Sequence, residues 1–201
     1  MPLAIIIGFL ISRNRIPGTI FLDIAVSLPL AVPPVVIGFL LLLLLGRGGP
    51  IGQILHNIFE TEIVFTWIAA VIASSIVSFP LVARATITAI GEIDEKLEHA
   101  ARTLGASQFR VLFTITIPLA YRGILAGTLL GFVRAMSEFG ATIIVAGNIP
   151  GKTQTIPLAI YSSVQLRDDK NAIMLTIFSI TLAILTLLVH NWLVTRTRKS
   201  S

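Results

Sequence analysis

The segment 146–153 contains the residue types that most directly suggest chemistry, because it spells a relaxed phosphate-binding loop ending in Gly-Lys-Thr. Such a loop binds nucleotide only where a strand precedes it and a helix follows it, so that backbone N–H groups converge on the phosphates. Here the preceding stretch is apolar and of membrane type, and Pro150 interrupts the loop. We therefore expect no nucleotide binding at this segment and interpret it as an outer turn.

Hydrolytic or group-transfer chemistry inside a membrane would need paired acids, a serine with a histidine partner, or a His/Glu cluster. Ser74, Ser75 and Ser78 have no histidine near them in the sequence. The three histidines are widely separated and there is no cysteine, so the sequence predicts no zinc-type metal site. An intramembrane enzyme remains a remote alternative, because neighbours in the fold are not visible at this level.

The composition of the chain decides its class. Of its 201 residues 55% are hydrophobic and only 12% are charged, whereas soluble domains contain about a quarter charged residues. Apolar runs of about 20 residues recur, which is long enough for a helix to cross the hydrocarbon core. We therefore predict an all-α polytopic membrane helix bundle with about five spans. The expected apolar segments are 2–12, 24–45, 63–83, 115–133 and 172–194, with 137–147 as a further short stretch.

The first apolar segment, 2–12, is shorter than the others. A helix of this length reaches about 16 Å, which is half a bilayer, so the segment is either re-entrant or the remaining part of a truncated span. We favour a truncated start. A signal peptide is not expected, because a basic region before the apolar run and a small-residue cleavage pattern after it are both missing.

Basic residues predict the orientation of the chain. Net charge is +5, and the scattered basic residues suit cytoplasmic loops rather than a nucleic-acid surface. The side expected to face the cytoplasm has Arg13, Arg15, Arg84, Lys96, Arg102, Arg110, Arg196, Arg198 and Lys199, and the opposite side has Arg47, Arg134, Lys152, Arg167 and Lys170. This places the loop 84–110 and the C-terminus in the cytoplasm.

The loop 91–110 is the one long hydrophilic stretch with the sequence features of a helix. Asp94 is a candidate N-cap, Gly105 is placed to end the helix in a left-handed conformation, and Ser107 can cap the next helix. A short, rigid helix with the small residues Ala100 and Ala101 on its surface is suited to docking in a groove of a partner. A solvated connecting loop without a partner is the alternative on physical grounds alone.

The same loop resembles a known motif. Glu98, Ala100, Ala101 and Gly105, followed by Ile115-x-Ile117-Pro118, look like the EAA loop of type I ABC importer permeases, with isoleucine at 117 where leucine is usual. The resemblance implies that 1–201 is a single type I transmembrane domain and that 91–110 is its coupling loop, which docks on an ATP-binding subunit. The coupling residues implied in this way are Glu98, Ala100, Ala101, Arg102, Leu104, Gly105 and Ala106.

Further segments narrow the resemblance to molybdate ABC transporter permeases. These are Ser27–Gly38, Gly46–Gly49, Ser78–Pro80, Ala100–Ala106, Ser137–Thr142, Asn148–Gly151 and Thr155–Pro157. Sulfate/thiosulfate and tungstate permeases are close relatives with a similar pattern around Glu138 and remain alternatives, although the compact length resembles the molybdate branch more. The outer turn 146–153 would then be where a delivery protein docks.

The segment 137–142 resembles the gate of these permeases. Phe139 can block a passage, Gly140 permits close approach, and Ser137 and Thr142 can donate hydrogen bonds to an oxyanion. Glu138 has the wrong charge to attract a dianion, and it follows Arg134 by four residues, which favours an intrahelical ion pair.

The resemblance also implies partners and location. The chain would be a non-catalytic permease subunit in the cell membrane that acts as a homodimer with cytoplasmic ABC ATPase subunits and an extracytoplasmic oxyanion-binding protein. It would bind no cofactor itself, because ATP and Mg²⁺ are bound by the ATPase, and no nucleic acid is expected.

Overall fold

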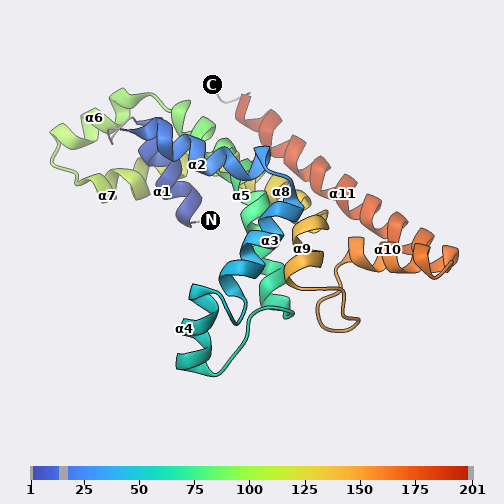
Figure 1. Cartoon of the computed structure of the whole chain (residues 1–201). Coiled ribbons are helices and arrows are strands. Elements are labelled where there is room, and N and C mark those ends of the chain that lie inside the picture. The colour runs from blue at the N-terminus through green and yellow to red at the C-terminus, as the bar shows by residue number, and fades with distance from the viewer. Residues whose placement is uncertain (1, 14–17, 199–201) are drawn as a thin grey trace. The chain divides into compact units, whose positions relative to one another are not determined.

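The computed structural model describes residues 2–13 and 18–198, except for the side chains of 59 and 196–198. Every regular element within these residues is helical (Figure 1). In chain order the helices are α1 Pro2–Ser12, α2 Thr19–Ala31, α3 Pro34–Leu45, α4 Pro50–Phe59, α5 Trp67–Gly91, α6 Glu95–Thr103, α7 Gln108–Val111, the π-helical η1 Leu112–Thr116, α8 Ile117–Met136, α9 Gly140–Val145, α10 Ile156–Gln165 and α11 Asp169–Arg198. Arg15 and Lys199, used above to predict orientation, lie outside the described residues.

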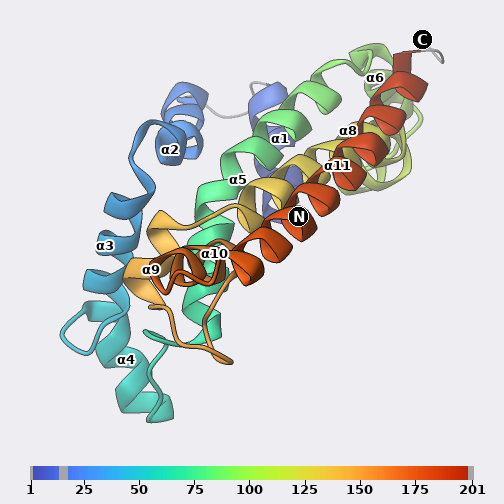
Figure 2. The ribbon, with the colours of Figure 1, turned by 90° about the vertical axis from the view of Figure 1, so that its right-hand side faces the viewer.

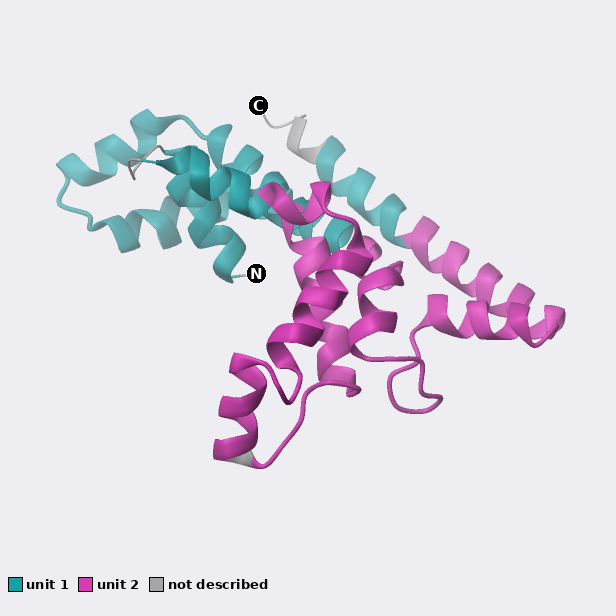
Figure 3. Cartoon of the chain, viewed as in Figure 1, with its two compact units in different colours: residues 1–26, 81–131, 186–201 teal, residues 27–80, 132–185 magenta. Residues whose placement is uncertain are grey.

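The chain forms two compact units (Figure 3). Unit 1 contains residues 1–26, 81–131 and 186–201, and unit 2 contains residues 27–80 and 132–185. The long helices α5, α8 and α11 each contribute residues to both units. The expected coupling loop therefore belongs to unit 1 and the expected gate segment to unit 2, and each unit is described by itself.

Unit 2 has a core of apolar side chains from α3, α5 and α9. Helices α3 and α9 lie side by side in both views (Figures 1 and 2). Gly38 permits this approach, since a Cβ at this position would lie 2.7 Å from the carbonyl oxygen of Ala141. Ala69 and Ala73, which are four residues apart on α5, are fully buried in the same core. Small residues thus set the spacing of the helices in this unit.

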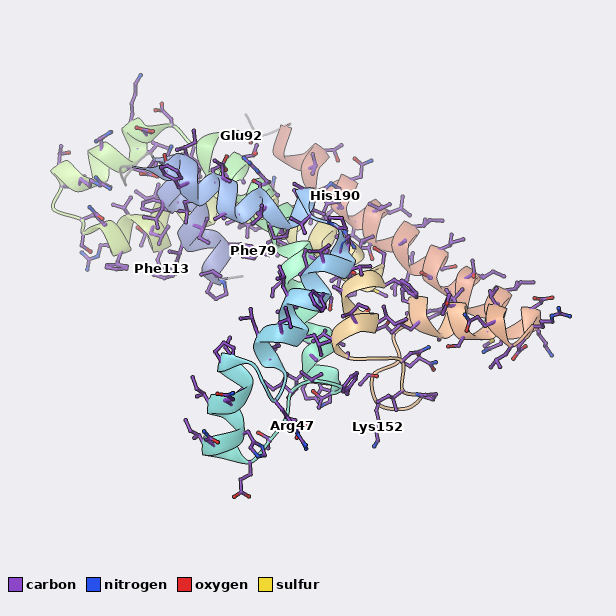
Figure 4. The ribbon with its side chains drawn as sticks, in the orientation of Figure 1. Arg47, Phe79, Glu92, Phe113, Lys152 and His190 are labelled. Carbon is purple, nitrogen blue, oxygen red and sulfur yellow. The ribbon has the colours of Figure 1, made fainter. Side chains whose placement is uncertain are left out.

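Unit 1 also uses glycine and alanine where the C-terminal part of α5 packs against α8. A Cβ at Gly123 would lie 2.5 Å from Cβ of Ala89, and one at Gly127 would lie 2.4 Å from Cβ of Ala85. A cavity of about 310 Å³ adjoins this crossing, and Glu92 and His190 are among its lining residues (Figure 4). The ring of His190 is fixed by its Nδ1, which lies 3.0 Å from a backbone carbonyl oxygen of α8.

Within the described residues, three helical segments are long and apolar enough to cross a membrane: Trp67–Gly91, Gln108–Met136 and Asp169–Thr195. The expected span 24–45 corresponds to a broken pair of helices, since α2 and α3 are separated by a break and bent by 109°. Pro34 at the first turn of α3 has no N–H to donate, and it forces Pro33 into extended backbone with ψ 135°. If the bent pair is one span, the described residues contain four, rather than the expected five. The segment 2–12 forms α1, a shorter apolar helix with the expected bounds.

The other predicted spans are helical but longer than expected. The helix α5 continues to Gly91, so the first part of the expected loop 84–110 is helical. The span predicted at 115–133 is part of a continuous helical run from Gln108 to Met136. This run widens to a π-helix at Leu112–Thr116, which ends two residues before Pro118. Since Pro118 lacks the N–H that an α-helix needs there, a local change of helix type is physically expected.

Candidate functional site

The helix α6 begins as the sequence predicts. The Asp94 side chain accepts a hydrogen bond from the backbone N–H of Lys96 at 2.9 Å, so it is the N-cap. Glu95 lies in the first turn, where a carboxylate interacts favourably with the positive end of the helix. The start of this helix is therefore fixed by side chains adjacent to it in sequence.

The end of α6 is a Schellman motif. The N–H of Gly105 donates to the carbonyl oxygen of Arg102 at 2.9 Å, and the N–H of Ala106 donates to that of Ala101 at 3.0 Å. Gly105 has a φ of +87°, which confirms the predicted left-handed position. Ser107 then caps α7 by accepting a hydrogen bond from the N–H of Arg110 at 3.4 Å. The result is a helix–turn–helix that is fixed at each end of its turn.

Large apolar side chains are exposed around this turn. Leu104 is 89% exposed and Phe109 is 76% exposed, while Ala100 is exposed and Ala101 is half-buried. Phe113 of η1 is also exposed (Figure 4). Exposed apolar side chains on a rigid hydrophilic loop are characteristic of a surface that binds another protein.

Two of the expected coupling residues point inward. Glu98 is only 2% exposed. Its Oε1 accepts hydrogen bonds from Nη2 and Nε of Arg13, at 2.9 and 3.2 Å, and from the hydroxyl of Thr116 at 3.0 Å. Arg102 lies one turn further along α6, and its Nε and Nη2 are buried without a hydrogen-bond partner among the described residues. Sequence reasoning missed Arg13 and Thr116, and counted Arg13 only toward orientation.

The charge of Glu138 is neutralised within unit 2. Its Oε2 forms an ion pair with Nη1 of Arg134 at 2.9 Å, and its Oε1 accepts a hydrogen bond from the N–H of Ala141 at 2.8 Å. The predicted pair is therefore present, but Glu138 lies beyond the end of α8 at Met136, so the pair is not within one helix. The carboxylate instead joins the end of α8 to the first turn of α9.

Phe139 and Gly140 lie where the start of α9 approaches α10 and α3. The ring of Phe139 contacts the ring of Tyr161 edge-on, with centroids 5.3 Å apart. A Cβ at Gly140 would lie 3.1 Å from the side chain of Val35. The structure thus shows close approach at Gly140 and an aromatic pair at Phe139.

The two hydroxyl groups of the gate segment are engaged with backbone. Ser137 Oγ donates to the carbonyl oxygen of Arg134 at 3.0 Å, and Thr142 Oγ1 donates to that of Phe139 at 2.9 Å. Thr142 is also buried. In this conformation neither hydroxyl proton is free for an oxyanion, so the donor role predicted from sequence requires both bonds to open.

The segment 146–153 does not have the geometry of a phosphate loop. The short helix α9, rather than a strand, precedes it. The N–H groups of Lys152, Thr153 and Gln154 all donate to one carbonyl oxygen, that of Ile149, at 2.9–3.2 Å. In this conformation these N–H groups point to one carbonyl oxygen and do not converge on a phosphate site. The side chain of Lys152 projects from this loop and is exposed (Figure 4).

Comparison with known proteins identifies the family. The family described as binding-protein-dependent transport system inner membrane component matches residues 1–199. The chain belongs to this family. Membership of this family supports the prediction that the chain is a permease subunit, and it excludes the alternative of an intramembrane enzyme.

Individual relatives agree with the family. The chain is 48% identical over 200 residues to the molybdenum transport system permease protein ModB of Haemophilus influenzae, covering 99% of this chain and 87% of the relative. It is 40% identical over 151 residues to the sulfate transport system permease protein CysW of Synechococcus elongatus, covering 75% of this chain and 52% of the relative.

A solved structure has the same fold. The MetNI methionine ABC transporter in an inward-facing conformation aligns with a TM-score of 0.69 at 15% identity, covering 96% of this chain and 85% of that one. The predicted all-α importer fold is therefore confirmed.

Proposed function

We propose that this chain is the membrane permease subunit of an ATP-driven importer of a tetrahedral oxyanion, foremost molybdate. The similarity to the Haemophilus influenzae molybdenum permease over 99% of this chain carries the choice of ion. Sulfate, thiosulfate and tungstate are the competing ions, and the sulfate relative, matched over less of both chains, supports them more weakly. The subunit would lie in the cell membrane with 91–110 and the C-terminus in the cytoplasm.

The coupling surface in this proposal is the turn between α6 and α7. Leu104 and Ala100 are exposed there and would enter a groove of the ABC ATPase, which binds ATP and Mg²⁺. Gly105 would hold the turn rigid, and Ala101, Arg102 and Ala106 would support it. Rigidity matters because a partner's movement is passed on only by a segment that does not deform.

The gate in this proposal is the segment Ser137–Thr142. The single helix α8, of 20 residues, follows the coupling segment in the chain and ends next to Ser137. Alternating access would then link movement at the coupling helix to opening at Phe139 and Tyr161. Because the carboxylate of Glu138 is already paired with Arg134, its charge would not repel an arriving dianion.

The partners in this proposal are a second copy of the chain, ABC ATPase subunits and an extracytoplasmic binding protein that docks at the outer loop 146–153. Only 11% of the apolar window of α11 is buried within the chain, which supports contact of this helix with lipid or a second copy. The requirement for a binding protein agrees with the family description.

Reconstitution tests the proposal. ATP hydrolysis is measured in proteoliposomes that contain this chain and its candidate ATPase, with binding protein that is empty or loaded with molybdate, tungstate or sulfate. We expect stimulation by the molybdate-loaded form and not by the empty form. Stimulation by the sulfate-loaded form alone would show that sulfate, rather than molybdate, is the transported ion. ATP hydrolysis that no loaded form changes would contradict the proposed importer.

A further inference from the structure

Arg13 is a charged residue buried at the end of an apolar helix. Its side chain is 5% exposed. Besides its two hydrogen bonds to Glu98, its Nη2 donates to the carbonyl oxygen of Ile93 at 3.1 Å and its Nη1 lies 3.3 Å from Oε1 of Glu95. All these groups belong to unit 1. One guanidinium thus joins the end of α1 both to the residue before the N-cap of α6 and to two side chains of α6.

Glu98 extends this contact to the next element. Thr116 is fully buried in η1, and its hydroxyl donates to the same Oε1 of Glu98 that Arg13 binds. The carboxylate therefore connects α6 to α1 on one side and to η1, which leads directly into α8, on the other. Hydrogen bonds to a buried charge are among the strongest in proteins, so the loss of one of them is costly.

We propose that Arg13 is a positioning residue that acts through Glu98 to hold the coupling helix α6 to α1 and to the start of α8. The set Arg13, Glu98 and Thr116 is called the clamp below. Through the clamp, movement that an ATPase imposes on α6 reaches two further helices without bending the loop. This inference rests on the proposed function, and assigns Glu98 a task inside the chain.

The burial pattern of α6 separates two tasks. Ala100 and Leu104 are exposed and available to the ATPase, whereas Glu98 and Arg13 are buried within unit 1. Substitution in the clamp should therefore impair transmission more than binding of the ATPase. A buried arginine away from the docking surface should also reproduce the defect of a Glu98 substitution, which a direct contact between Glu98 and the ATPase would not predict.

The experiment compares Arg13→Gln, Glu98→Gln and the double variant with wild type in the proteoliposome assay, using molybdate-loaded binding protein. Arg47→Gln is the matched control, because Arg47 is 77% exposed in its ion pair with Glu62 in unit 2. We expect each single variant to assemble with the ATPase and to import roughly tenfold less molybdate per ATP hydrolysed. The double variant should lose less than the product of the two single losses, because the two substitutions share the bond between Arg13 and Glu98.

A conservative variant separates coupling from folding. Arg13→Lys keeps the charge but loses the fork of donors, so its import per ATP should lie between that of wild type and that of Arg13→Gln. Import per ATP by Arg13→Gln equal to that of Arg47→Gln, while Glu98→Gln is impaired, overturns the clamp. If Arg13→Gln does not assemble with the ATPase, Arg13→Lys takes its place in this comparison.

Hydrogen exchange of the α6 amides gives a readout that does not depend on transport. Arg13→Gln should speed this exchange, whereas Arg47→Gln should leave it unchanged. A wild-type complex that no loaded binding protein stimulates would count against the proposed function, and the exchange measurement would still decide the clamp. Equal exchange in Arg13→Gln and wild type overturns it.

Discussion

Substitution of Gly105 tests the rigidity of the coupling turn most directly. Its φ is +87°, and an added Cβ would meet nothing within 4 Å. Alanine therefore introduces no clash, and its cost is the strain of left-handed backbone, about 1–2 kcal/mol. Asparagine should cost less, since it tolerates this conformation. Proline should cost more, because its ring excludes a positive φ and it loses the N–H that donates to Arg102.

Hydrogen exchange of the α6 amides measures this cost locally. A loss of about 1–2 kcal/mol should speed exchange through local opening roughly 5- to 30-fold. Import per ATP should be highest for Gly105→Asn, lower for Gly105→Ala and lowest for Gly105→Pro. All three variants should still insert into the membrane. Gly91→Ala is the control, because Gly91 also has nothing within 4 Å of an added Cβ but is not in a left-handed conformation. If Gly105→Ala and Gly91→Ala exchange and transport alike, the reasoning is refuted.

Three further predictions concern other parts of the chain. Gly127→Ala should destabilise the protein by about 1–3 kcal/mol, because its Cβ would lie 2.4 Å from that of Ala85, and Ala85→Gly should restore thermal stability in detergent; an unchanged melting temperature would contradict the close helix crossing. Arg134→Gln should lower the melting temperature more than Glu138→Gln, because the first leaves a buried carboxylate without its ion pair, whereas the second keeps an acceptor for the α9 N–H; equal shifts would count against this burial. The wild-type subunit alone should bind no fluorescent ATP analogue, and nucleotide binding that Lys152→Gln abolishes would show that the outer loop does bind it.

Sequence reasoning succeeded where structure is decided by neighbouring residues. The N-cap at Asp94, the left-handed Gly105 and the cap at Ser107 depend on backbone conformation within a few residues, so residue type and spacing were sufficient. The ends of spans were less predictable. Hydropathy marks where apolar residues stop, but the helix α5 continues through polar residues to Gly91, because tertiary packing stabilises it there.

The consecutive prolines at 33 and 34 mark a break that hydropathy does not locate. Hydropathy predicts one apolar segment over 24–45, whereas the structure bends the chain between α2 and α3. The partners of Glu98 could not be predicted in the same way. Arg13 is 85 residues away in sequence, and no spacing rule connects it to Glu98. The engaged hydroxyls of Ser137 and Thr142 were also beyond reach, since their acceptors depend on where α8 ends.

The ion pair between Arg13 and Glu98 limits how permeases of this kind can be recombined. A chimaera that receives residues 91–110 from another permease would gain a new carboxylate at 98 but keep its own Arg13 and Thr116, which lie outside the graft. The exchanged loop would present the right surface to a foreign ATPase while its inner contacts belonged to two different proteins. A graft that keeps these contacts must therefore also include Arg13 at the end of α1 and Thr116 in η1, although the two residues are far apart in the sequence.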